Sequence, residues 1–342
     1  MTFRDFYKGK MILVTGGVGS VGSHLVKTLL KFDPRTVRIL DVSEAGLYEL
    51  EQELQSEKIR AFIGDIRDKE RLTGIFEGVD IVFHAAALKN VPMCEYNPIE
   101  AVKTNVIGTQ NLIDICLYEE VGKVILTSTG KAVNPTTVMG ATKLLAEKLI
   151  TSANYHKERK KTVFSSVRFG NVVGSSGSVI PLFKKQIKNG GPVTITNREM
   201  IRPVLLMHNA ISLLIKAAQL SQGGEIFISK MKSMKIMDLA EVMIEELAPK
   251  YGYTPQEIEI KIIGIKLGEK LHEEFISENE ARRTLETDDM YVLLPEMKEL
   301  SYINESFYPA ASKVKIKARS PKNQSNLNKE EIKNMLRVIG FL

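Results

Sequence analysis

A glycine-rich segment near the N-terminus constrains the fold more than any other part of this sequence. The segment, Thr15–Gly22 (TGGVGSVG), follows the short apolar stretch Met11–Val14 and precedes an amphipathic stretch, 20–32, that is typical of a helix. Its GxxGxxG spacing allows a tight turn, close approach of the backbone to a pyrophosphate, and close packing of the helix on the strand. The N-terminus of the helix then offers unpaired N–H groups to an anion. A strand, a glycine loop and a helix in this order predict a dinucleotide-binding unit, whose phosphate-facing residues would be Gly16, Gly19, Ser20, Val21 and Gly22.

Short apolar stretches alternate with longer amphipathic stretches through the first half of the chain. The predicted strands are 11–14, 36–40, 61–63, 81–84, 124–127 and 162–168, and the predicted helices are 20–32, 44–56, 67–77, 97–119 and 138–158. This alternation is typical of βαβ units and a parallel sheet. We therefore expect an α/β protein, with a Rossmann-type, doubly wound parallel sheet over residues 1–172.

The regular alternation weakens after about residue 172. Short β-like pieces are predicted at 193–196, 225–229 and 258–263, interleaved with helices at 207–221 and 236–248. We expect a smaller C-terminal substrate-binding lobe over 173–310 that shares late strands with the sheet. A basic tail follows over 311–342, extended until a short helix at 329–336, which Asn328 caps with Glu331 three residues further on.

The net charge of the chain lies in its tail. The formal charge is +6 over 342 residues, and residues 311–342 hold eight Lys and Arg against two Glu, so residues 1–310 are neutral. A neutral body lacks the basic surface that nucleic-acid binding requires. Three interpretations of the tail stay open: a solvated extension, a subunit contact, or a weak tether to anionic lipid.

Other sequence features exclude several classes of protein. The chain has no stretch of 18 apolar residues, and the apolar run before Thr15 is too short for a signal peptide, so we expect no membrane span. Its two cysteines, Cys94 and Cys116, form no disulfide framework, and its five histidines show no metal-ligand spacing. We therefore expect a cytoplasmic protein without a metal site.

Residues at the ends of the predicted strands indicate which dinucleotide binds. Asp41 ends the second strand about 20 residues after the glycines, where a carboxylate accepts both ribose hydroxyls of NAD and repels the 2′-phosphate of NADP. This position favours NAD over NADP. Asp65 and Ile66 follow the third strand, where adenine could bind, although a helix cap explains this segment equally well. The fourth strand ends in small residues that leave room for the cofactor, namely Ala85, Ala86 and Ala87.

The chain as a whole resembles the extended short-chain dehydrogenase/reductases over about residues 8–295. Within that superfamily it resembles the nucleotide-sugar 4,6-dehydratases of polysaccharide and glycan synthesis, which act on UDP-N-acetylglucosamine. The motifs that carry the resemblance are TGGVGSVG, GDIRD, HAAALKNVPMCEYNP, KTNVIGT, LTSTGKAVNP, VMGATKLLAEKL, RFGNVVGSSGSVIPLF and GIKLGEKLHEE. The stretch LDVSEAGLYELEQEL is similar to the NAD-using, membrane-tethered members of the group.

This resemblance implies a reaction and a set of site residues. NAD would take a hydride from sugar C4, water would leave from C5 and C6, and the hydride would return to C6, with no net redox change. The substrate would be a UDP-sugar, and the protein a homo-oligomer. The implied catalytic residues are Thr129, Lys131, Met139 and Lys143, and the implied cofactor contacts include Asn105 and Lys143. The implied substrate contacts are Lys89, Asn171, Ser178, Val179, Thr194, Thr196, Arg202 and Glu269, although half-buried strand threonines explain Thr194 and Thr196 equally well.

Three positions depart from the family pattern. Met139 stands where the superfamily usually has the Tyr of YxxxK, but the dehydratase subgroup also has Met there, which predicts an apolar filler. Gly130 stands where the family has the Asp thought to protonate the departing C6 hydroxyl, and Lys131 is the nearest substitute. Arg202 has Ile and Pro as neighbours, where the family tends to have Thr and an aromatic residue.

These departures leave three hypotheses. The first is an NAD-dependent UDP-N-acetylhexosamine 4,6-dehydratase. The second is a sugar 4-epimerase, since epimerases carry a small residue at the position of Gly130 but usually keep the Tyr that Met139 replaces. The third is a protein that binds NAD or a nucleotide sugar without turnover. His84, beside the alanines, is predicted to be a strand-end residue with its hydrogen bonds satisfied rather than an acid or base.

Overall fold

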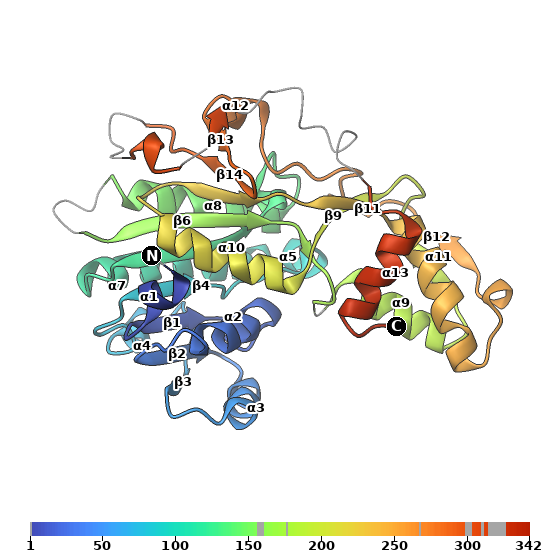
Figure 1. Cartoon of the computed structure of the whole chain (residues 1–342), viewed down its shortest axis with the longest axis horizontal. Helices are drawn as coiled ribbons and strands as arrows, with labels where there is room; N and C mark the ends of the chain where they lie inside the picture. Colours follow the sequence, from blue (N-terminus) through green and yellow to red (C-terminus); the bar gives the residue numbers. More distant parts are fainter. Residues whose placement is uncertain are drawn as a thin grey trace. The chain divides into compact units, whose positions relative to one another are not determined.

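The computed structural model describes residues 2–155, 161–175, 177–266, 268–297, 303–308, 311–313 and 326–342 (Figure 1). The chain divides into two compact units. Unit 1 comprises Met1–Phe169, His208–Ser229 and Phe275–Ile316. Unit 2 comprises Gly170–Met207, Lys230–Glu274 and Lys317–Leu342.

Unit 1 is built on a sheet that has ten strands among the described residues, in the order β15-β13-β14-β10-β6-β5-β4-β1-β2-β3. The seven strands from β10 to β3 run parallel, and β14, β13 and β15 add an antiparallel edge. The parallel strands are β1 (Met11–Thr15), β2 (Thr36–Asp41), β3 (Ile59–Ile63), β4 (Ile81–His84), β5 (Lys123–Thr129), β6 (Val163–Phe169) and β10 (Ile226–Ser229). The edge strands are β13 (Thr284–Glu286), β14 (Met290–Leu293) and β15 (Ser312–Lys313).

Helices cover both faces of this sheet. One apolar row crosses four neighbouring strands through Leu13, Val82, Val124 and Phe164, and it packs under α4, α7 and α8. Figure 1 shows α2 and α10 on the other face. This arrangement confirms the doubly wound parallel sheet. The helices of unit 1 are α1 (Phe3–Tyr7), α2 (Ser20–Leu30), α3 (Glu44–Leu54), α4 (Lys69–Leu72), α5 (Val91–Tyr96), α6 (Pro98–Val102), α7 (Gly108–Tyr118), α8 (Val138–Ala153), α10 (Met207–Leu220) and α12 (Glu278–Ala281).

Several predicted helices differ from the structure. The single helix expected at 97–119 is α6, a π-helical turn at Lys103–Ile107, and α7. The helix expected at 67–77 is helical only at Lys69–Leu72, since Gly74 has a φ of +82° that ends it. The helix expected at 138–158 ends at Ala153, and the last part of the expected helix, 156–158, lies outside the described residues. Helix α1, which was not predicted, is held by a hydrogen bond from the Tyr7 hydroxyl to the α10 backbone.

The boundary between the expected lobes also differs. The segments 207–221 and 225–229, expected in the second lobe, form α10 and β10 in unit 1, because β10 pairs in parallel with β6 and extends the large sheet. The edge strands β13 and β14 also fall within 173–310 and join the same sheet, and β15 joins it from the expected tail. Residues 208–229 and the part of 275–310 that the structure describes therefore belong to unit 1, although they fall within the expected lobe 173–310.

Unit 2 is smaller, and its described residues form short strands and three longer helices. A three-stranded sheet has the order β11-β9-β7, and β12 pairs in parallel with β8. Its apolar core joins side chains of all three helices. The elements are β7 (Asn171–Val172), α9 (Val179–Lys188), β8 (Val193–Ile195), β9 (Ile201–Leu205), β11 (Lys232–Lys235), α11 (Ile236–Leu247), β12 (Ile260–Ile262) and α13 (Lys329–Val338).

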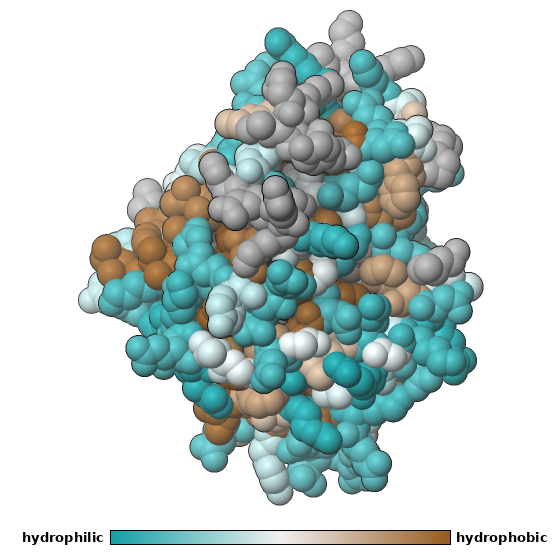
Figure 2. All heavy atoms as spheres, turned by 90° about the vertical axis from the view of Figure 1, so that its left-hand side faces the viewer, coloured by the Kyte–Doolittle hydropathy of each residue, from teal (hydrophilic) through white to brown (hydrophobic). Residues whose placement is uncertain are grey.

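The surface mixes hydrophilic residues with small hydrophobic patches. On the face shown in Figure 2, hydrophilic residues predominate and hydrophobic residues gather in patches between them. Among the residues that the structure describes, no helix is long and apolar enough to cross a membrane.

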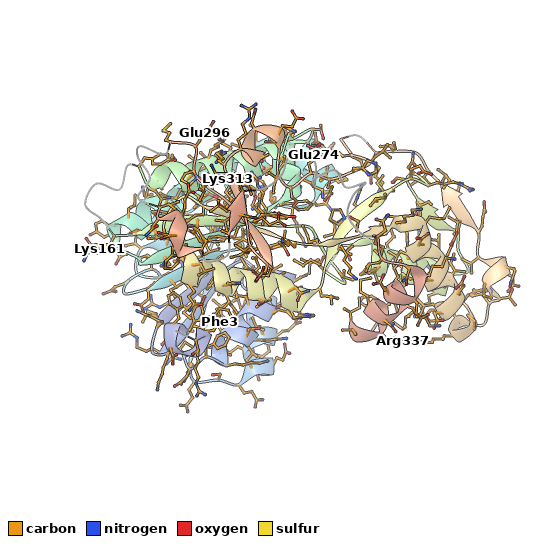
Figure 3. All side chains as sticks on the ribbon, turned by 45° about the horizontal axis from the view of Figure 1, so that its top comes forward. Phe3, Lys161, Glu274, Glu296, Lys313 and Arg337 are labelled. Atoms are coloured by element: carbon orange, nitrogen blue, oxygen red, sulfur yellow. The ribbon has the colours of Figure 1, made fainter. Side chains whose placement is uncertain are left out.

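The helix predicted in the basic tail is present and belongs to the core of unit 2. Asn328 and Glu331 form the predicted capping box of α13. Ile332 and Leu336 are fully buried in the unit 2 core, while Arg337, labelled in Figure 3, lies on the same helix. This part of the tail is therefore not a solvated extension, because its apolar face is covered; residues 314–325 lie outside the described residues.

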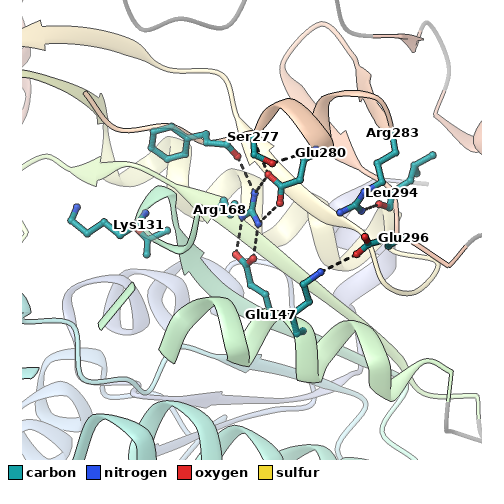
Figure 4. A network of polar contacts seen from close by, with 11 residues as sticks. Lys131, Glu147, Arg168, Ser277, Glu280, Arg283, Leu294 and Glu296 are labelled. Carbon is teal, nitrogen blue, oxygen red and sulfur yellow. Dashed lines mark hydrogen bonds and ion pairs between the residues drawn. The ribbon is translucent and has the colours of Figure 1, made fainter. Parts of the chain in front are cut away.

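A buried arginine joins three segments of unit 1 (Figure 4). Arg168 on β6 is 1% exposed. Its guanidinium donates two hydrogen bonds to Glu147 of α8 (2.9 and 2.7 Å), two to Glu280 of α12 (3.1 and 2.8 Å), and one to the carbonyl oxygen of Phe275 (3.0 Å). Burial alone would lower the pKa of Arg168, but the two carboxylates outweigh burial and raise that pKa. All five guanidinium donors are used, so this buried charge is fully compensated.

We expect replacement of this arginine to destabilise unit 1. The variant Arg168→Met leaves two carboxylates without their cation, one of them fully buried, which costs about 3–5 kcal/mol of unfolding free energy. Lys148→Met is the matched control, because Lys148 forms an exposed pair with Glu296 (3.0 Å) that is worth only about 0–1 kcal/mol. Urea unfolding of both variants measures the difference. Equal losses in the two variants would contradict the role given to Arg168.

Candidate functional site

The glycine loop of unit 1 forms a cradle with no room for side chains. Gly16 has a φ of +65°, and a Cβ atom there would lie 2.6 Å from the backbone N of Ala86. A Cβ atom at Gly22 would lie 2.2 Å from the carbonyl oxygen of Gly16. Helix α2 begins at Ser20, and its N-cap, Gly19, has no side chain that could accept the first N–H groups. The first turn of α2 can therefore serve an anion, as the sequence predicts.

Asp41 connects the glycine loop to the turn that follows β2. One carboxylate oxygen accepts a hydrogen bond from the Val18 N–H (3.2 Å), and the other accepts from the Ser43 N–H (3.1 Å). These contacts hold the carboxylate at the end of β2, next to the loop. In dinucleotide-binding folds, a protein carboxylate at this position accepts hydrogen bonds from the ribose.

The segment after β3 supports the helix-cap interpretation for one of its residues. Asp68, not Asp65, caps α4. Asp65 instead forms an ion pair with Arg67 (2.5 Å), and the hydrogen bond from Arg67 lowers the pKa of Asp65. Ile66 is 4% exposed and lies where a Cβ atom at Gly108 would come within 2.8 Å of its side chain. Ile66 therefore packs on the start of α7.

His84 is the centre of a directed chain of hydrogen bonds. The Thr109 hydroxyl donates to the Asn105 carbonyl oxygen (2.7 Å), so its oxygen accepts from His84 Nε2–H (3.2 Å). His84 Nδ1 then accepts from the Thr15 hydroxyl (2.7 Å). Burial, aided by the nearby Lys143 ammonium, lowers the pKa of His84 to about 3. His84 is thus a neutral residue with satisfied hydrogen bonds, as predicted.

Asn105 lies in the π-helical turn and is 2% exposed. Its side-chain amide donates to the Leu88 carbonyl oxygen (2.9 Å) and to the Thr142 hydroxyl (3.0 Å), and its oxygen accepts from the Leu88 N–H (2.8 Å). Both amide hydrogens are therefore used within the protein. Asn105 joins the chain that follows the alanines to the first turns of α8, and the π-helical turn presents its side chain for this purpose.

Met139 and Lys143 lie one helical turn apart on α8, as the spacing predicts. Met139 is 4% exposed and packs with Cys94 and Ala101, which agrees with its predicted role as an apolar filler. Lys143 Nζ donates to the Thr127 carbonyl oxygen (2.7 Å). Burial lowers the pKa of Lys143 to about 8, against the opposing effect of Glu147.

The start of α8 lies directly against the segment that follows β5. A Cβ atom at Gly140 would lie 2.4 Å from the Lys131 carbonyl oxygen, so only glycine permits this approach. Thr129 caps the short 3₁₀ turn Gly130–Ala132 by accepting a hydrogen bond from the Lys131 N–H (3.3 Å). The structure therefore brings Thr129, Lys131, Met139 and Lys143 to one region of unit 1. Gly130, which is buried, lies in the middle of it.

The residues expected to contact the substrate lie mainly in unit 2. Arg202 on β9 donates to Glu269 (3.0 Å) and to the Leu271 carbonyl oxygen (3.1 Å), and its Nε is 4.0 Å from Glu273. Two predicted contacts, Arg202 and Glu269, are thus brought together. Lys89 is exposed in unit 1, after the alanines.

The remaining predicted contacts of unit 2 lie around helix α9. Asn171 is in β7, Ser178 is the N-cap of α9, and Val179 is its first residue. Thr194 on β8 accepts a hydrogen bond from the Gln186 side chain (2.8 Å), which agrees with a half-buried strand threonine, and Thr196 follows β8.

Sequence reasoning missed the side chains that hold this region together. Arg168 and Glu147 were not predicted as partners, although an arginine inside an apolar strand and a glutamate one turn after Lys143 are signals of a buried pair. Two threonines, Thr15 and Thr109, form hydrogen bonds with His84, and the sequence gave no signal of these bonds.

The residues of unit 1 fit a nicotinamide dinucleotide. The glycine cradle excludes side chains, the first turn of α2 can take a diphosphate, and Asp41 can accept from a ribose. The buried Lys143 lies on the helix that borders the strand ends. Such a cofactor supplies reversible hydride transfer when it is bound.

We expect His84 to make stability depend on pH. Its pKa is about 3 in the folded state and near 6.5 in the unfolded state, so the unfolded state binds the additional proton between these values and stability falls as pH falls below about 6.5. His84→Gln lacks this titration. The difference in unfolding free energy between wild type and His84→Gln therefore shrinks by about 1.4 kcal/mol per pH unit as the pH falls below about 6.5. Chemical unfolding between pH 7 and 4.5 measures it, with His24→Gln as the exposed control. Parallel curves for wild type and His84→Gln would show that His84 is not held neutral.

Comparison with known proteins reveals relatives along nearly the whole chain. An uncharacterized membrane protein of Methanocaldococcus jannaschii is 58% identical over 99% of this chain and 98% of its own length. A UDP-N-acetylglucosamine 4,6-dehydratase (inverting) of Campylobacter jejuni is 44% identical over 85% of both chains. A UDP-glucose 4-epimerase of Rickettsia bellii is 35% identical over 97% of both chains.

A solved structure and a family model agree with these relatives. The X-ray structure of Pen from Bacillus thuringiensis has a TM-score of 0.90 and 41% identity, covering 98% of this chain and 99% of that one. The family model described as polysaccharide biosynthesis protein matches residues 12–295. The chain therefore belongs to the polysaccharide biosynthesis protein family, among the extended short-chain dehydrogenase/reductases of the nucleotide-sugar dehydratase group.

Proposed function

We propose that this chain catalyses the NAD-dependent 4,6-dehydration of a UDP-N-acetylhexosamine, with UDP-N-acetylglucosamine as the substrate, in glycan biosynthesis. The observation that carries the proposal is the close approach at Gly140, which places the Lys131 segment against the helix that bears Met139 and Lys143. The Campylobacter dehydratase supports the same reaction, since it is 44% identical over most of this chain.

NAD is the proposed cofactor, and NADP is less favoured. The Asp41 carboxylate is held at the end of β2 by the backbone of the glycine loop, where a negative charge repels a 2′-phosphate. Gly16, Gly19 and Gly22, with Ser20 and Val21 in the first turn of α2, would hold the diphosphate. Asp65, Ile66, Ala85, Ala86, Ala87 and Asn105 would border the rest of the cofactor.

The catalytic residues of unit 1 would bind and move protons in distinct ways. Lys143, whose ammonium donates a hydrogen bond to the Thr127 carbonyl oxygen, would orient the cofactor ribose near the reacting carbon. The C5 proton must leave and the C6 hydroxyl must gain a proton, and Lys131, which directly follows Gly130 in the sequence, is the proposed substitute for the missing acid. Because glycine offers no proton, we expect slow turnover in the natural chain.

Unit 2 supplies most of the proposed substrate contacts. Arg202 would pair with the diphosphate, since a guanidinium suits the oxygens of a phosphate, and Glu269 already fixes its orientation (3.0 Å). Ser178 and Val179 begin α9, and the Ser178 hydroxyl is buried without a hydrogen-bond partner in the structure. The other proposed contacts are Lys89, Asn171, Thr194, Thr196 and Glu269.

Two further expectations stay predictions. The resemblance implies a homo-oligomer, and large apolar side chains are exposed on the neighbouring helices α5 and α6, at Met93, Tyr96 and Ile99. The cysteine content and the short apolar run before Thr15 predict a cytoplasmic enzyme, and the free thiols of Cys94 and Cys116 are compatible with a reducing compartment.

The reaction is tested by incubating the protein with UDP-N-acetylglucosamine and NAD and measuring the mass of the product by mass spectrometry. Loss of one water is expected, and Gly130→Asp should accelerate it by about 10²-fold or more, because a positioned general acid is worth about 10²–10⁴ in rate. Gly130→Asn is the matched control, since it adds similar bulk without an acidic proton.

The other outcomes separate the alternatives. A product of unchanged mass indicates a 4-epimerase, whose relatives are also similar to this chain. Saturable binding of UDP-N-acetylglucosamine with no new product indicates a binding protein. Equal rates for Gly130→Asp and Gly130→Asn would contradict the role assigned to this position.

The cofactor preference is tested by calorimetric titration with NAD and NADP. Wild type should bind NAD at least about tenfold more tightly, a difference of about 1.4 kcal/mol. Asp41→Asn keeps the size of the side chain and removes its charge, so it should bind NADP more tightly than wild type does. An unchanged NADP affinity in Asp41→Asn would mean that this carboxylate does not select the cofactor.

A further inference from the structure

The last residues of the chain return to the segment between β7 and α9. They lie beyond residue 295, where the family match ends, so the family pattern assigns them no role. Helix α13 is fixed in the unit 2 core by Ile332 and Leu336. Ion pairs join it to helix α11, between Lys329 and Glu241 (2.8 Å) and between Lys333 and Glu246. The C-terminal end of α13, from which the last residues of the chain continue, is therefore fixed in position within unit 2.

The chain reverses sharply at the end of α13. Gly340 has a φ of +73°, its N–H donates to the Arg337 carbonyl oxygen (3.0 Å), and the Phe341 N–H donates to the Leu336 carbonyl oxygen (3.0 Å). These two hydrogen bonds form a Schellman motif, which satisfies the last carbonyls of a helix and turns the chain back. The motif therefore fixes the backbone positions of Ile339 and Phe341 relative to α13.

Phe341 and Ile339 cover a turn at Gly174. The turn spans Val172–Ser175 and is closed by a hydrogen bond from the Ser175 N–H to the Val172 carbonyl oxygen (3.3 Å). Gly174 has a φ of +75°, and a Cβ atom there would lie 3.2 Å from the Phe341 ring and 3.7 Å from Ile339. The backbone of the turn thus lies directly against these two side chains.

The same aromatic ring also contacts α9. The Lys184 ammonium lies 5.3 Å from the centre of the Phe341 ring, a cation–π contact. The Ser178 N–H donates to the Ser175 carbonyl oxygen (3.1 Å), so the Gly174 turn is hydrogen-bonded to the start of α9. One side chain therefore touches both the turn and the helix that follows it.

We propose that Ile339 and Phe341 are positioning residues for the nucleotide diphosphate, acting through the Gly174 turn and the N-terminus of α9. The identity of the ligand rests on the proposed function. Asn171 lies just before the turn and Ser178 just after it, so the conformation of the turn sets the spacing between two substrate contacts. Ordering the turn in advance removes an entropic cost from binding.

The test compares Phe341→Ala with Val338→Ala, since Val338 is the last residue of α13, close to Phe341 in the sequence, and is 72% exposed. Calorimetry with UDP as the probe measures affinity, and a parallel titration with NAD reports on unit 1. Phe341→Ala should weaken UDP binding by about tenfold, the cost of ordering a few side chains and a turn on binding, and leave NAD affinity unchanged. Phe341→Tyr keeps the ring and should restore UDP affinity.

Hydrogen–deuterium exchange without nucleotide provides a readout that does not depend on the ligand. The Ser175 and Ser178 amides should exchange faster in Phe341→Ala than in wild type or Val338→Ala, while the melting temperature verifies folding. Unchanged exchange, or faster exchange with unchanged UDP affinity, would overturn the positioning role. If wild type binds NAD but no UDP, the proposed function fails, and the exchange rates still decide whether Phe341 holds the turn.

Discussion

The buried guanidinium of Arg168 is the interaction on which the organisation of unit 1 depends. It joins helix α8, through Glu147, to the point at Phe275 where the chain returns from unit 2, and it lies one residue before the last residue of β6. Helix α8 also bears Met139 and Lys143. A single charged group therefore joins the helix of the reacting region to the unit 1 side of two of the points where the chain passes between the units, Phe169 and Phe275. Since all five of its donors are used, loss of either carboxylate would leave a buried group without a partner.

Much of unit 1 could be predicted because its signals are local. The strand, glycine loop and helix are consecutive, and small residues at Ala85–Ala87 follow directly from β4. The capping box of α13 is a four-residue pattern, and it is present. In contrast, the π-helical turn at Lys103–Ile107 accompanies bonds from Asn105 to Leu88 and Thr142, which are distant in the sequence. The edge strands are short, and they are defined by pairing rather than by periodicity: β14 pairs with β10, β13 with β14, and β15 with β13.

The same distinction applies to the candidate site. Residue types at motif positions predicted Lys143, Met139 and Asp41, and the structure brings the first two onto one turn of α8. The partner of Arg168 at Glu280 is 112 residues away, so no spacing rule could identify it. The interpretation of the tail also changed. Its net charge left a solvated extension, a subunit contact and a lipid tether open, whereas the apolar face of α13 is buried in the unit 2 core and Lys329 pairs with Glu241 of α11, whose hydrogen bond raises the pKa of Lys329.

In the proposed reaction, a hydride moves from C4 to C6 within one sugar during dehydration, despite Gly130. Deuterium at C4 of UDP-N-acetylglucosamine tests it most directly, with mass spectrometry and NMR locating the label after incubation with NAD. The expected product has lost one water and carries the deuterium at C6. A product of unchanged mass, or a dehydrated product without the label, would contradict the claim.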